Sequence, residues 1–320
     1  MTHYDVFNGD ADGICALQQL RLAEPKASTL ITGVKRDIQL LKNINGEASD
    51  TITALDISFD KNRTDVIRLL DKSIKIEYFD HHFAGDIPDH PKLKTYINTA
   101  SDTCTSLIVD TYLSGAHRLW AIVGAFGDNF DDKAQNLAHQ FQLSNSNIEK
   151  LKNLGIAINY NAYGATEADL HFKPDELAML IHPYKSPLDF INESETCKTL
   201  QAGYAEDLAK ANNLKPEYNT KQTALYILPN QAWARRVSGV YANALCQAHP
   251  NRAHALLTKQ DGDSYLVSVR APLATKTGAD DLCRQFETGG GRKAAAGINT
   301  LAFTDVELFM KKFNNQFCPS

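Results

Sequence analysis

The stretch Tyr4-Asp5-Val6-Phe7-Asn8-Gly9-Asp10-Ala11-Asp12-Gly13 decides the fold, because it joins an apolar run to two closely spaced carboxylates. Residues 4–7 predict a β-strand, and apolar residues at helical spacing from Ile14 to Leu22 predict the helix that follows. In an open parallel sheet, ligands bind beyond the carboxyl ends of the strands. This stretch therefore predicts an α/β domain with a polar site where its first strand ends.

The same alternation continues along the first part of the chain. Residues 52–55 and 74–79 are further apolar runs that predict strands, and residues 64–70 between them have helical spacing. Strand–helix–strand alternation predicts a parallel sheet with helices on both faces. Further helices are predicted over residues 103–115 and 117–126, followed by a mostly helical region from 149 to 180.

Acidic and histidine residues occur where the predicted strands end. The second strand ends at Asp56, the third ends at the triplet Asp80-His81-His82, and Asp128 lies in a later loop. Because the carboxyl ends of parallel strands share one edge of a sheet, we expect these residues to meet Asp10 and Asp12 in one crevice. Each piece alone is also typical of a turn, a helix cap or a surface loop, so the interpretation depends on their combination.

A crowd of carboxylates of this kind predicts bound cations. Ionised carboxylates close together raise each other's pKa, and divalent ions remove that repulsion. Carboxylate oxygens with one imidazole suit Mn²⁺ or Mg²⁺ better than a metal that prefers thiolates. Two ions about 3.5–4 Å apart would share a bridging carboxylate and activate a water for attack on a phosphorus centre. The sequence therefore predicts two divalent ions, Mn²⁺ first and Mg²⁺ as the alternative.

A proline-punctuated break at residues 182–187 divides the chain. We predict a metal-binding catalytic domain over residues 1–190, a helical connector over 191–220, and a smaller α/β domain over 221–320. The connector contains one predicted helix at residues 193–213. The elements predicted in the last domain are strands at 224–228, 253–258 and 265–270 and helices at 234–248 and 304–316.

Three consecutive glycines and two cationic residues lie at positions 289–293. Glycines let the backbone bring N–H groups close to an anion, and residues 292–297 predict the start of a helix whose N-terminus favours phosphate. A cationic pair can clamp a terminal phosphate, as can an arginine at a strand end. A flexible glycine hinge and a solvated arginine are the alternatives. The candidate substrate ligands in this stretch are Gly289, Gly290, Gly291, Arg292 and Lys293.

In this order the motifs resemble those of the DHH phosphoesterase superfamily, named for the Asp-His-His triplet found here at residues 80–82. The stretch Thr288-Gly289-Gly290-Gly291-Arg292-Lys293-Ala294-Ala295-Ala296-Gly297 resembles the signature of the associated DHHA1 domain. The resemblance spans nearly the whole chain and is to two-domain members of the nanoRNase and RecJ type. It implies a metal-dependent phosphoesterase with an N-terminal DHH domain and a C-terminal DHHA1 domain.

The resemblance also implies the metal ligands. Asp10 and Asp56 would hold one ion, and Asp56 would bridge to the other. Relatives place a further His or Asp at the first ion, and the nearest equivalent here is Asn8, a neutral and weaker ligand. The second ion would be held by Asp12, Asp56, His81 and Asp128.

The remaining motif residues would act on the substrate. By resemblance, His82 would face the scissile phosphate, and Asp80 would orient the histidines. Arg270, in Ser268-Val269-Arg270, resembles the arginine of the family's Ser-x-Arg strand and would bind a substrate phosphate. The family signature usually carries a histidine directly after the glycines, where this chain has Arg292 and Lys293. This departure affects the expected base preference and pH response.

Charge is divided unevenly along the chain. Residues 1–220 carry a formal net charge of −10 and residues 221–320 carry +5, which together give −5. An acidic domain that holds cations and a basic domain that holds anions would produce this division. Long nucleic acids usually require a broad basic track, and the sequence contains no long Lys/Arg run. The charge division therefore predicts a very short substrate, with no long duplex as partner. Together with the family resemblance, it predicts hydrolysis of linear dinucleotides or very short oligonucleotides to nucleoside 5′-monophosphates, and the resemblance implies pGpG as a candidate because family members degrade it.

Other activities also fit these motifs. Within the enzyme class, the alternatives are a 3′-phosphoadenosine 5′-phosphate phosphatase and a cyclic-dinucleotide phosphodiesterase. A family II pyrophosphatase is less favoured, because its C-terminal domain lacks the triple glycine. Outside the enzyme class, the alternative is a non-catalytic nucleotide sensor on the same fold.

Composition gives an expected compartment. No apolar run approaches the ~18–20 residues of a membrane span, and the N-terminus lacks the layout of a secretion signal. The six cysteines are scattered without a close pair, which favours a reducing environment. We expect a cytoplasmic protein with no membrane partner, and the sequence leaves a homodimer open.

Overall fold

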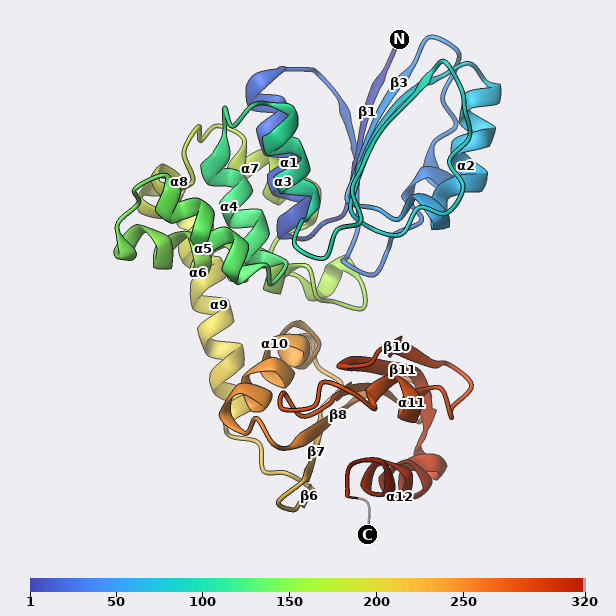
Figure 1. The fold of residues 1–320 in the computed structure, drawn as a ribbon, viewed down its shortest axis with the longest axis vertical. Helices are drawn as coiled ribbons and strands as arrows, with labels where there is room; N and C mark the ends of the chain where they lie inside the picture. The colour runs from blue at the N-terminus through green and yellow to red at the C-terminus, as the bar shows by residue number, and fades with distance from the viewer. Residues whose placement is uncertain (319–320) are drawn as a thin grey trace. The chain divides into compact units, whose positions relative to one another are not determined.

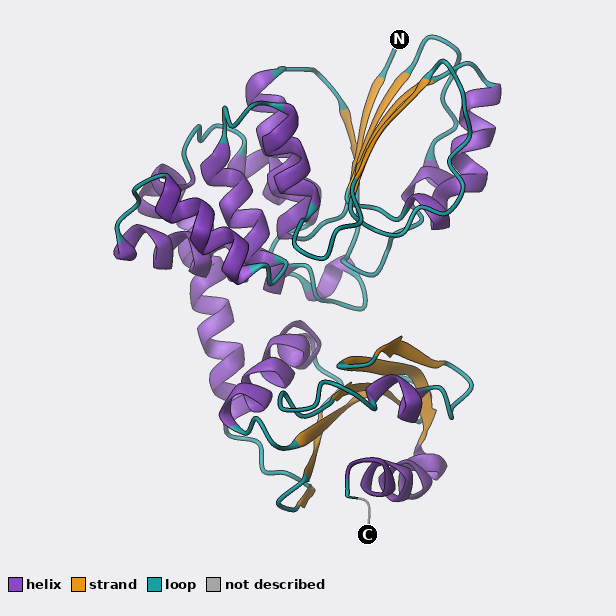
Figure 2. Ribbon diagram, in the orientation of Figure 1, coloured by secondary structure: helices purple, strands orange, loops and turns teal. Residues whose placement is uncertain are grey.

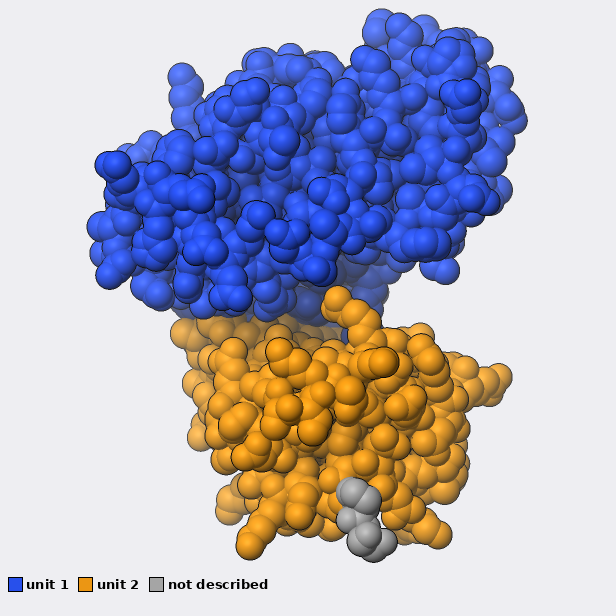
Figure 3. Space-filling view, viewed as in Figure 1, with its two compact units in different colours: residues 1–203 blue, residues 204–320 orange. Residues whose placement is uncertain are grey.

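The computed structural model describes residues 1–318, and the chain forms two compact units, residues 1–203 and 204–320 (Figure 3). The division falls within helix α9 (Glu195–Asn212). That helix lies inside the range 191–220 predicted as a connector, and it corresponds to the single helix predicted at 193–213. Each unit contains one sheet with hydrophobic cores on both of its faces.

The first unit is built on a five-stranded parallel sheet in the order β2-β1-β3-β4-β5. The predicted strands at 4–7, 52–55 and 74–79 are confirmed as β1, β3 and β4. The two edge strands were not predicted, because both are short and only partly buried and so lack an apolar run. The strands are β1 (His3–Phe7), β2 (Thr29–Ile31), β3 (Thr51–Leu55), β4 (Lys75–Asp80) and β5 (Leu93–Ile97).

Helices cover both faces of this sheet, as predicted (Figures 1 and 2). Phe7 and Phe79 point to one core, whereas Val6 and Tyr78 point to the other, as the two-residue repeat of a strand requires. One face packs on α1 (Ala11–Ala23) and α3 (Thr105–Tyr112), and α4 (Arg118–Gly127) and α6 (Asn145–Asn161) pack on α1 and extend the same core. The other face packs on α2 (Phe59–Asp71) and η1 (Leu40–Asn43).

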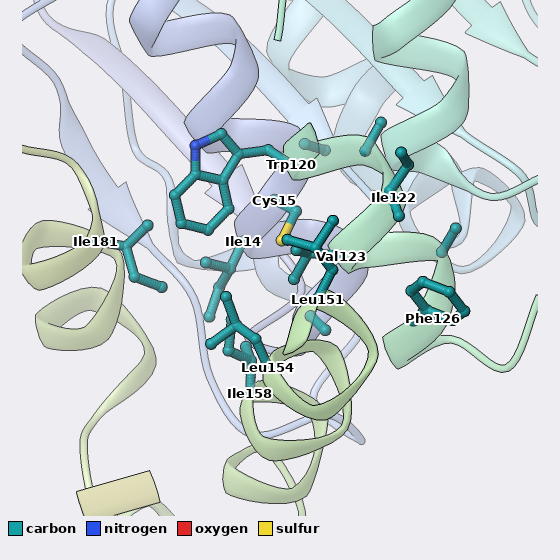
Figure 4. Packing of buried hydrophobic residues seen from close by; sticks show 14 of the residues in the cluster. Ile14, Cys15, Trp120, Ile122, Val123, Phe126, Leu151, Leu154, Ile158 and Ile181 are labelled. Atoms are coloured by element: carbon teal, nitrogen blue, oxygen red, sulfur yellow. The ribbon is translucent and has the colours of Figure 1, made fainter. Parts of the chain in front are cut away.

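The larger core joins α1, α4 and α6 (Figure 4). Trp120 of α4 is fully buried there, with Ile14 and Leu154 in the same cluster. Helices α4 and α6 approach closely because of two glycines. A Cβ on Gly155 would lie 2.4 Å from the Val123 carbonyl oxygen, and one on Gly127 would lie 2.8 Å from the Gly155 carbonyl oxygen. This contact fixes the end of α4, immediately before Asp128.

The region after α4 is helical, and the prediction of a mostly helical segment over 149–180 is confirmed. A loop containing the short η2 (Glu167–Asp169) separates α6 from the next helix. Among the helices within residues 1–318, none is long and apolar enough to cross a membrane. The remaining helices of the first unit are α5 (Asp131–Gln140), α7 (Pro174–Ile181) and α8 (Pro187–Glu193).

The second unit contains a mixed six-stranded sheet in the order β10-β11-β9-β8-β7-β6. Strands β7 and β8 are parallel and joined through α10 (Ala232–Ala248), and the other pairings are antiparallel. Helices α11 (Ala279–Cys283) and α12 (Val306–Phe317) pack on one face and α10 on the other. The strands are β6 (Tyr218–Asn219), β7 (Thr223–Leu228), β8 (Ala253–Gln260), β9 (Ser264–Arg270), β10 (Gly289–Arg292) and β11 (Ala295–Ala302).

One local prediction for this unit is wrong. Residues 292–297 do not start a helix but form the end of β10, the turn and the beginning of β11 in the β10–β11 hairpin. Alanines favour helix in isolation, yet Ala296 pairs with Val269 of β9, and burial alternates along β11. Gly291 has φ 141°, and a Cβ there would lie 2.5 Å from the Ala296 Cα. Close pairing of two strands therefore overrides helix propensity.

Candidate metal site at the carboxyl edge of the first sheet

The candidate site lies where the strand order reverses. In the order β2-β1-β3-β4-β5, the chain leaves β1 and β3 in opposite directions, and such switch points form the ligand crevice of open α/β sheets. Asp10 follows β1, Asp56 follows β3, and Asp80 is the last residue of β4. Asp128 comes from a helix end instead, at the C-terminal cap of α4.

Asp12 is held by the start of helix α3. Its two carboxylate oxygens accept hydrogen bonds from the backbone N–H groups of Thr105 and Ser106, each at 2.7 Å. The Ser106 hydroxyl also donates to the Asp12 carbonyl oxygen at 2.8 Å. A helix N-terminus favours a negative charge, so the first amides of α3 are suitable partners for this buried carboxylate and fix its orientation.

Asp56 adopts a left-handed backbone conformation, with φ 57°, as the chain turns out of β3. Its carboxylate accepts a hydrogen bond from the Thr105 hydroxyl at 3.1 Å. Burial and the negative charges of Asp12 and Asp10 raise the pKa of Asp56 well above its usual value. Without a cation, the ionised form of Asp56 is therefore unfavourable in the folded protein.

The Asp80-His81-His82 triplet is organised by its fully buried aspartate. Asp80 accepts backbone hydrogen bonds from both histidines, at 2.9 and 3.2 Å, and a side-chain bond from His82 Nδ1 at 2.6 Å. Burial opposes protonation of His82, but the bond to Asp80 and the charge of Asp80 outweigh it and raise the His82 pKa. Because Nδ1 is engaged, His82 has its Nε2 available for another group.

Histidine 81 lies among the carboxylates. Its Nε2 is 3.5 Å from an Asp56 oxygen and 3.7 Å from an Asp128 oxygen. Two groups of side chains have donor atoms within 4.8 Å of one another: Asp12, His81 and Asp128, and Asp56, His81 and His82. Burial raises the pKa of Asp128 as well. Hard oxygen donors with imidazole, crowded at like charge, fit a divalent ion such as Mn²⁺ or Mg²⁺.

Asp10 lies in a different environment. One of its oxygens caps α1 by accepting from the N–H groups of Asp12 and Gly13, at 3.0 and 3.1 Å. The other accepts from Lys35 Nζ at 2.5 Å. Burial opposes ionisation of Asp10, but the Lys35 charge lowers its pKa. Asn8, the predicted weak ligand, is buried, and its Oδ1 has no hydrogen-bond partner within residues 1–318.

The predicted substrate ligands all lie in the second unit. Arg270 ends β9, where it pairs with Ala295 of the hairpin, and its guanidinium donates to Asn243 and Ser268, each at 2.9 Å. Gly289 and Gly290 lie on β10, the edge strand of the sheet, and Arg292 ends that strand. Lys293 lies in the hairpin turn, and both cationic side chains are exposed.

Several residues at the first sheet were missed by sequence reasoning. The start of the helix predicted at 103–115 was a usable signal, because the first amides of a helix can bind an anion such as Asp12. Lys35 and Asn159 offered no such signal, since they are brought to Asp10 only by folding. Phe83, directly after the triplet, is 76% exposed, which is unusual for an aromatic side chain.

Comparison with known proteins agrees with this geometry. No family model matches the chain, and a search of curated proteins finds no match. Solved structures do match. A DHH-domain structure described as belonging to a family of ribosomal proteins has a TM-score of 0.66 at 13% identity, covering 98% of this chain and 86% of its own.

Two further neighbours carry descriptions of activity. The exonuclease RecJ bound to manganese has a TM-score of 0.61 at 15% identity, covering 98% of this chain and 89% of its own. PggH from Vibrio cholerae, described as a pGpG-specific phosphodiesterase, has a TM-score of 0.58 at 13% identity, covering 99% of this chain and 100% of its own.

These neighbours define the class of fold. A parallel five-stranded sheet, a helical middle and a mixed six-stranded sheet form the architecture of DHH and DHHA1 domains. The chain therefore has the fold of DHH-domain proteins over nearly its full length. At these identities the likeness establishes the fold, while the substrate depends on the residues of the site.

Proposed function

We propose that this protein is a metal-dependent phosphodiesterase that hydrolyses linear dinucleotides or very short oligonucleotides, such as pGpG, to nucleoside 5′-monophosphates. One observation carries the proposal. Asp12, Asp56, His81 and Asp128, which are far apart in sequence, meet at the switch point of a DHH-type sheet. The manganese bound to RecJ supports Mn²⁺ as the first choice of ion.

Different residues would bind the ion, orient an imidazole and act on the phosphate. Asp12, Asp56, His81 and Asp128 would hold a divalent ion, which when bound lowers the pKa of an attacking water and offsets phosphate charge. Asp80 holds the His82 imidazole through Nδ1. His82 Nε2 would then stabilise the charge of the scissile phosphate or protonate the leaving oxygen.

The choice of a short substrate has separate support. PggH and this chain cover each other almost completely, whereas the sequence contains no basic track for a long strand. Phe83 offers an exposed ring beside His82 on which a base can stack. In the second unit, the proposed phosphate ligands are Arg270, Gly289, Gly290, Gly291, Arg292 and Lys293.

A substrate panel tests the proposal. Purified protein is incubated with pGpG, pApA, longer oligonucleotides, cyclic dinucleotides and 3′-phosphoadenosine 5′-phosphate, with Mn²⁺, with Mg²⁺ and with a chelator. We expect 5′-monophosphates from the linear dinucleotides, faster with Mn²⁺, and none with the chelator. Exclusive cleavage of long single strands would overturn the proposed substrate, as would exclusive activity on either of the other two substrate classes.

A matched pair of variants separates an enzyme from a sensor. Asp128→Ala removes a carboxylate of the site, whereas Asp132→Ala removes an exposed one four residues further on. Asp128→Ala should bind dinucleotide but lose hydrolysis, and Asp132→Ala should behave as the wild type. Wild-type protein that binds pGpG and never hydrolyses it in Mn²⁺ would favour the sensor.

A further inference from the structure

The position expected for the first metal ion does not fit an ion in this structure. The DHH resemblance assigns that ion to Asp10 and Asp56, with Asn8 as a weak extra ligand. Both Asp10 oxygens are engaged, one with two backbone N–H groups and the other with Lys35 Nζ. Within residues 1–318, Asp10 also belongs to neither group of side chains whose donors are close enough to share an ion.

Lys35 is built into this position. Its backbone N–H donates to the Ala162 carbonyl oxygen at 3.0 Å, and its own carbonyl accepts from Asn8 Nδ2 at 3.4 Å. Its side chain is 21% exposed. Backbone contacts to two separate segments therefore fix where the ammonium enters the site.

The ammonium group uses its full donor capacity. Lys35 Nζ lies 2.5 Å from an Asp10 oxygen, 2.9 Å from Asn159 Oδ1 and 3.4 Å from an Asp128 oxygen. The three N–H donors of the ammonium thus have three acceptors. Lys35 Nζ also lies over the Tyr163 ring, 5.5 Å from its centroid. A divalent ion between Asp10 and Asp56 would have to displace this charge or be repelled by it.

The neighbouring side chains match a lysine better than a metal. Asn8 and Asn159 are neutral amides, and the amide of Asn159 already accepts from the ammonium. The carboxylates of Asp10 and Asp128 both face Lys35, and its single positive charge offsets part of their negative charge. By contrast, Asp12, His81 and Asp128 have donor atoms within 4.8 Å of one another. His81 Nε2 lies 3.5 Å from an Asp56 oxygen and 3.7 Å from the Asp128 oxygen that does not face Lys35.

We propose that Lys35 takes the place of the first metal ion, so that the chain binds one divalent ion, at Asp12, Asp56, His81 and Asp128, beside a fixed ammonium. This inference rests on the proposed metal-dependent phosphodiesterase and replaces the predicted pair of ions. The ammonium neutralises Asp10 and holds Asp128 toward the remaining ion. Lys35 is therefore a positioning residue whose charge the chain supplies itself.

The proposal is tested by counting the Mn²⁺ ions bound per chain and by measuring whether two bound ions are magnetically coupled. Chelator-stripped protein is titrated with Mn²⁺, the bound metal is counted by mass spectrometry, and the ions are observed by electron paramagnetic resonance. We expect one ion per chain, with the signal of an isolated Mn²⁺. Two ions per chain with an exchange-coupled signal would overturn the proposal.

Variants make the test specific to Lys35. Lys35→Met keeps the aliphatic stem but removes the charge, and we expect a second, weaker Mn²⁺ site that couples to the first. Lys35→Met combined with Asn8→His supplies a stronger ligand and should tighten that second site. Lys35→Arg and the exposed control Lys42→Met should each bind one ion. If both charge-removing variants still bind one ion while remaining folded by circular dichroism, the proposal is wrong.

The outcomes distinguish this inference from the proposed function. Wild-type protein that binds one Mn²⁺ but hydrolyses no substrate leaves the inference standing and removes the proposed function. Wild-type protein that hydrolyses the substrate with two coupled Mn²⁺ ions supports the proposed function and removes the inference about Lys35. Wild-type protein that binds no Mn²⁺ removes both.

Discussion

The carboxylate cluster of the first unit, around Asp56, needs a bound cation to offset its charge, whereas the β10–β11 glycine hairpin of the second unit needs no ligand to hold its shape. At the cluster, Asp56 is buried beside other carboxylates, and burial and their negative charges raise the pKa of Asp56. In the hairpin, the glycines pair with β11, which pairs with β9, so the local structure is complete through backbone hydrogen bonds. The carboxylate cluster therefore gives up stability for binding, whereas the hairpin holds its shape through close backbone packing.

We expect the largest effect from Asp56→Asn, which removes a carboxylate from the cluster. Hydrolysis should fall roughly 10³-fold, because a ligand of the ion is lost. The metal-free protein should nevertheless gain about 1–3 kcal/mol of unfolding free energy, because a buried and crowded charge is removed. Activity assays and denaturation in chelator measure the two effects.

The stability gained by Asp56→Asn should depend on pH. The folded pKa of Asp56 lies above the usual 3.8, so its ionisation destabilises the folded state as the pH rises through and beyond that value. The gain from Asp56→Asn should therefore shrink as the pH falls toward 3.8. Unchanged hydrolysis, or a variant less stable than wild type in chelator at neutral pH, would show that the Asp56 carboxylate neither holds the ion nor costs stability.

A pair of glycine variants tests the hairpin. A Cβ on Gly289 would lie 1.8 Å from the Cys283 carbonyl oxygen, a backbone atom that cannot easily move away, whereas a Cβ on Gly290 meets nothing within 4 Å. Gly289→Ala should lower the unfolding free energy by about 2–4 kcal/mol, and Gly290→Ala by under about 1 kcal/mol. Chemical denaturation compares them, and equal effects would show that packing does not set the hairpin.

The two units should also respond oppositely to acid. His254 on β8 is fully buried, and burial, with help from the Arg252 and His249 charges, lowers its pKa from 6.5 to about 4. The unfolded chain takes up this proton first, so the unfolding free energy should be constant above about pH 6.5 and fall by up to about 3 kcal/mol toward pH 4.

His254→Gln provides the control for that window. It should remove this part of the pH dependence while leaving the Asp56 response unchanged. Urea midpoints at several pH values, measured in chelator, make the comparison. A variant whose midpoint falls between pH 6.5 and 4 as steeply as that of the wild type would refute the assignment.

The smallest expected effect concerns substrate contacts that leave the fold intact. Phe83→Ala should raise the KM for pGpG about 10-fold with little change in kcat, because one stacked base is worth about 1–3 kcal/mol. Phe83→Trp should restore the KM. Arg292→Ala should likewise weaken binding more than it slows the chemistry. A change confined to kcat in either alanine variant would place that residue at the chemistry instead.

Sequence reasoning was strongest where a local pattern dictates a local structure. The apolar runs at β1, β3 and β4 showed both the strands and the residues at their ends. The edge strands β2 and β5 were not visible, because partly exposed strands lack a continuous apolar run. The helix predicted from residue 292 was wrong, since pairing with β9 overrode the preference of the alanines.

By itself, the sequence determined that carboxylates would gather at one edge of a parallel sheet, because period-two burial and the strand ends are written in consecutive residues. Tertiary structure alone decided which cation each carboxylate meets. Lys35, Asn159 and the start of α3 reach the site from distant segments, and no local pattern encodes that approach. The physical reason is that electrostatic partnership depends on distance in space, which only the folded chain defines.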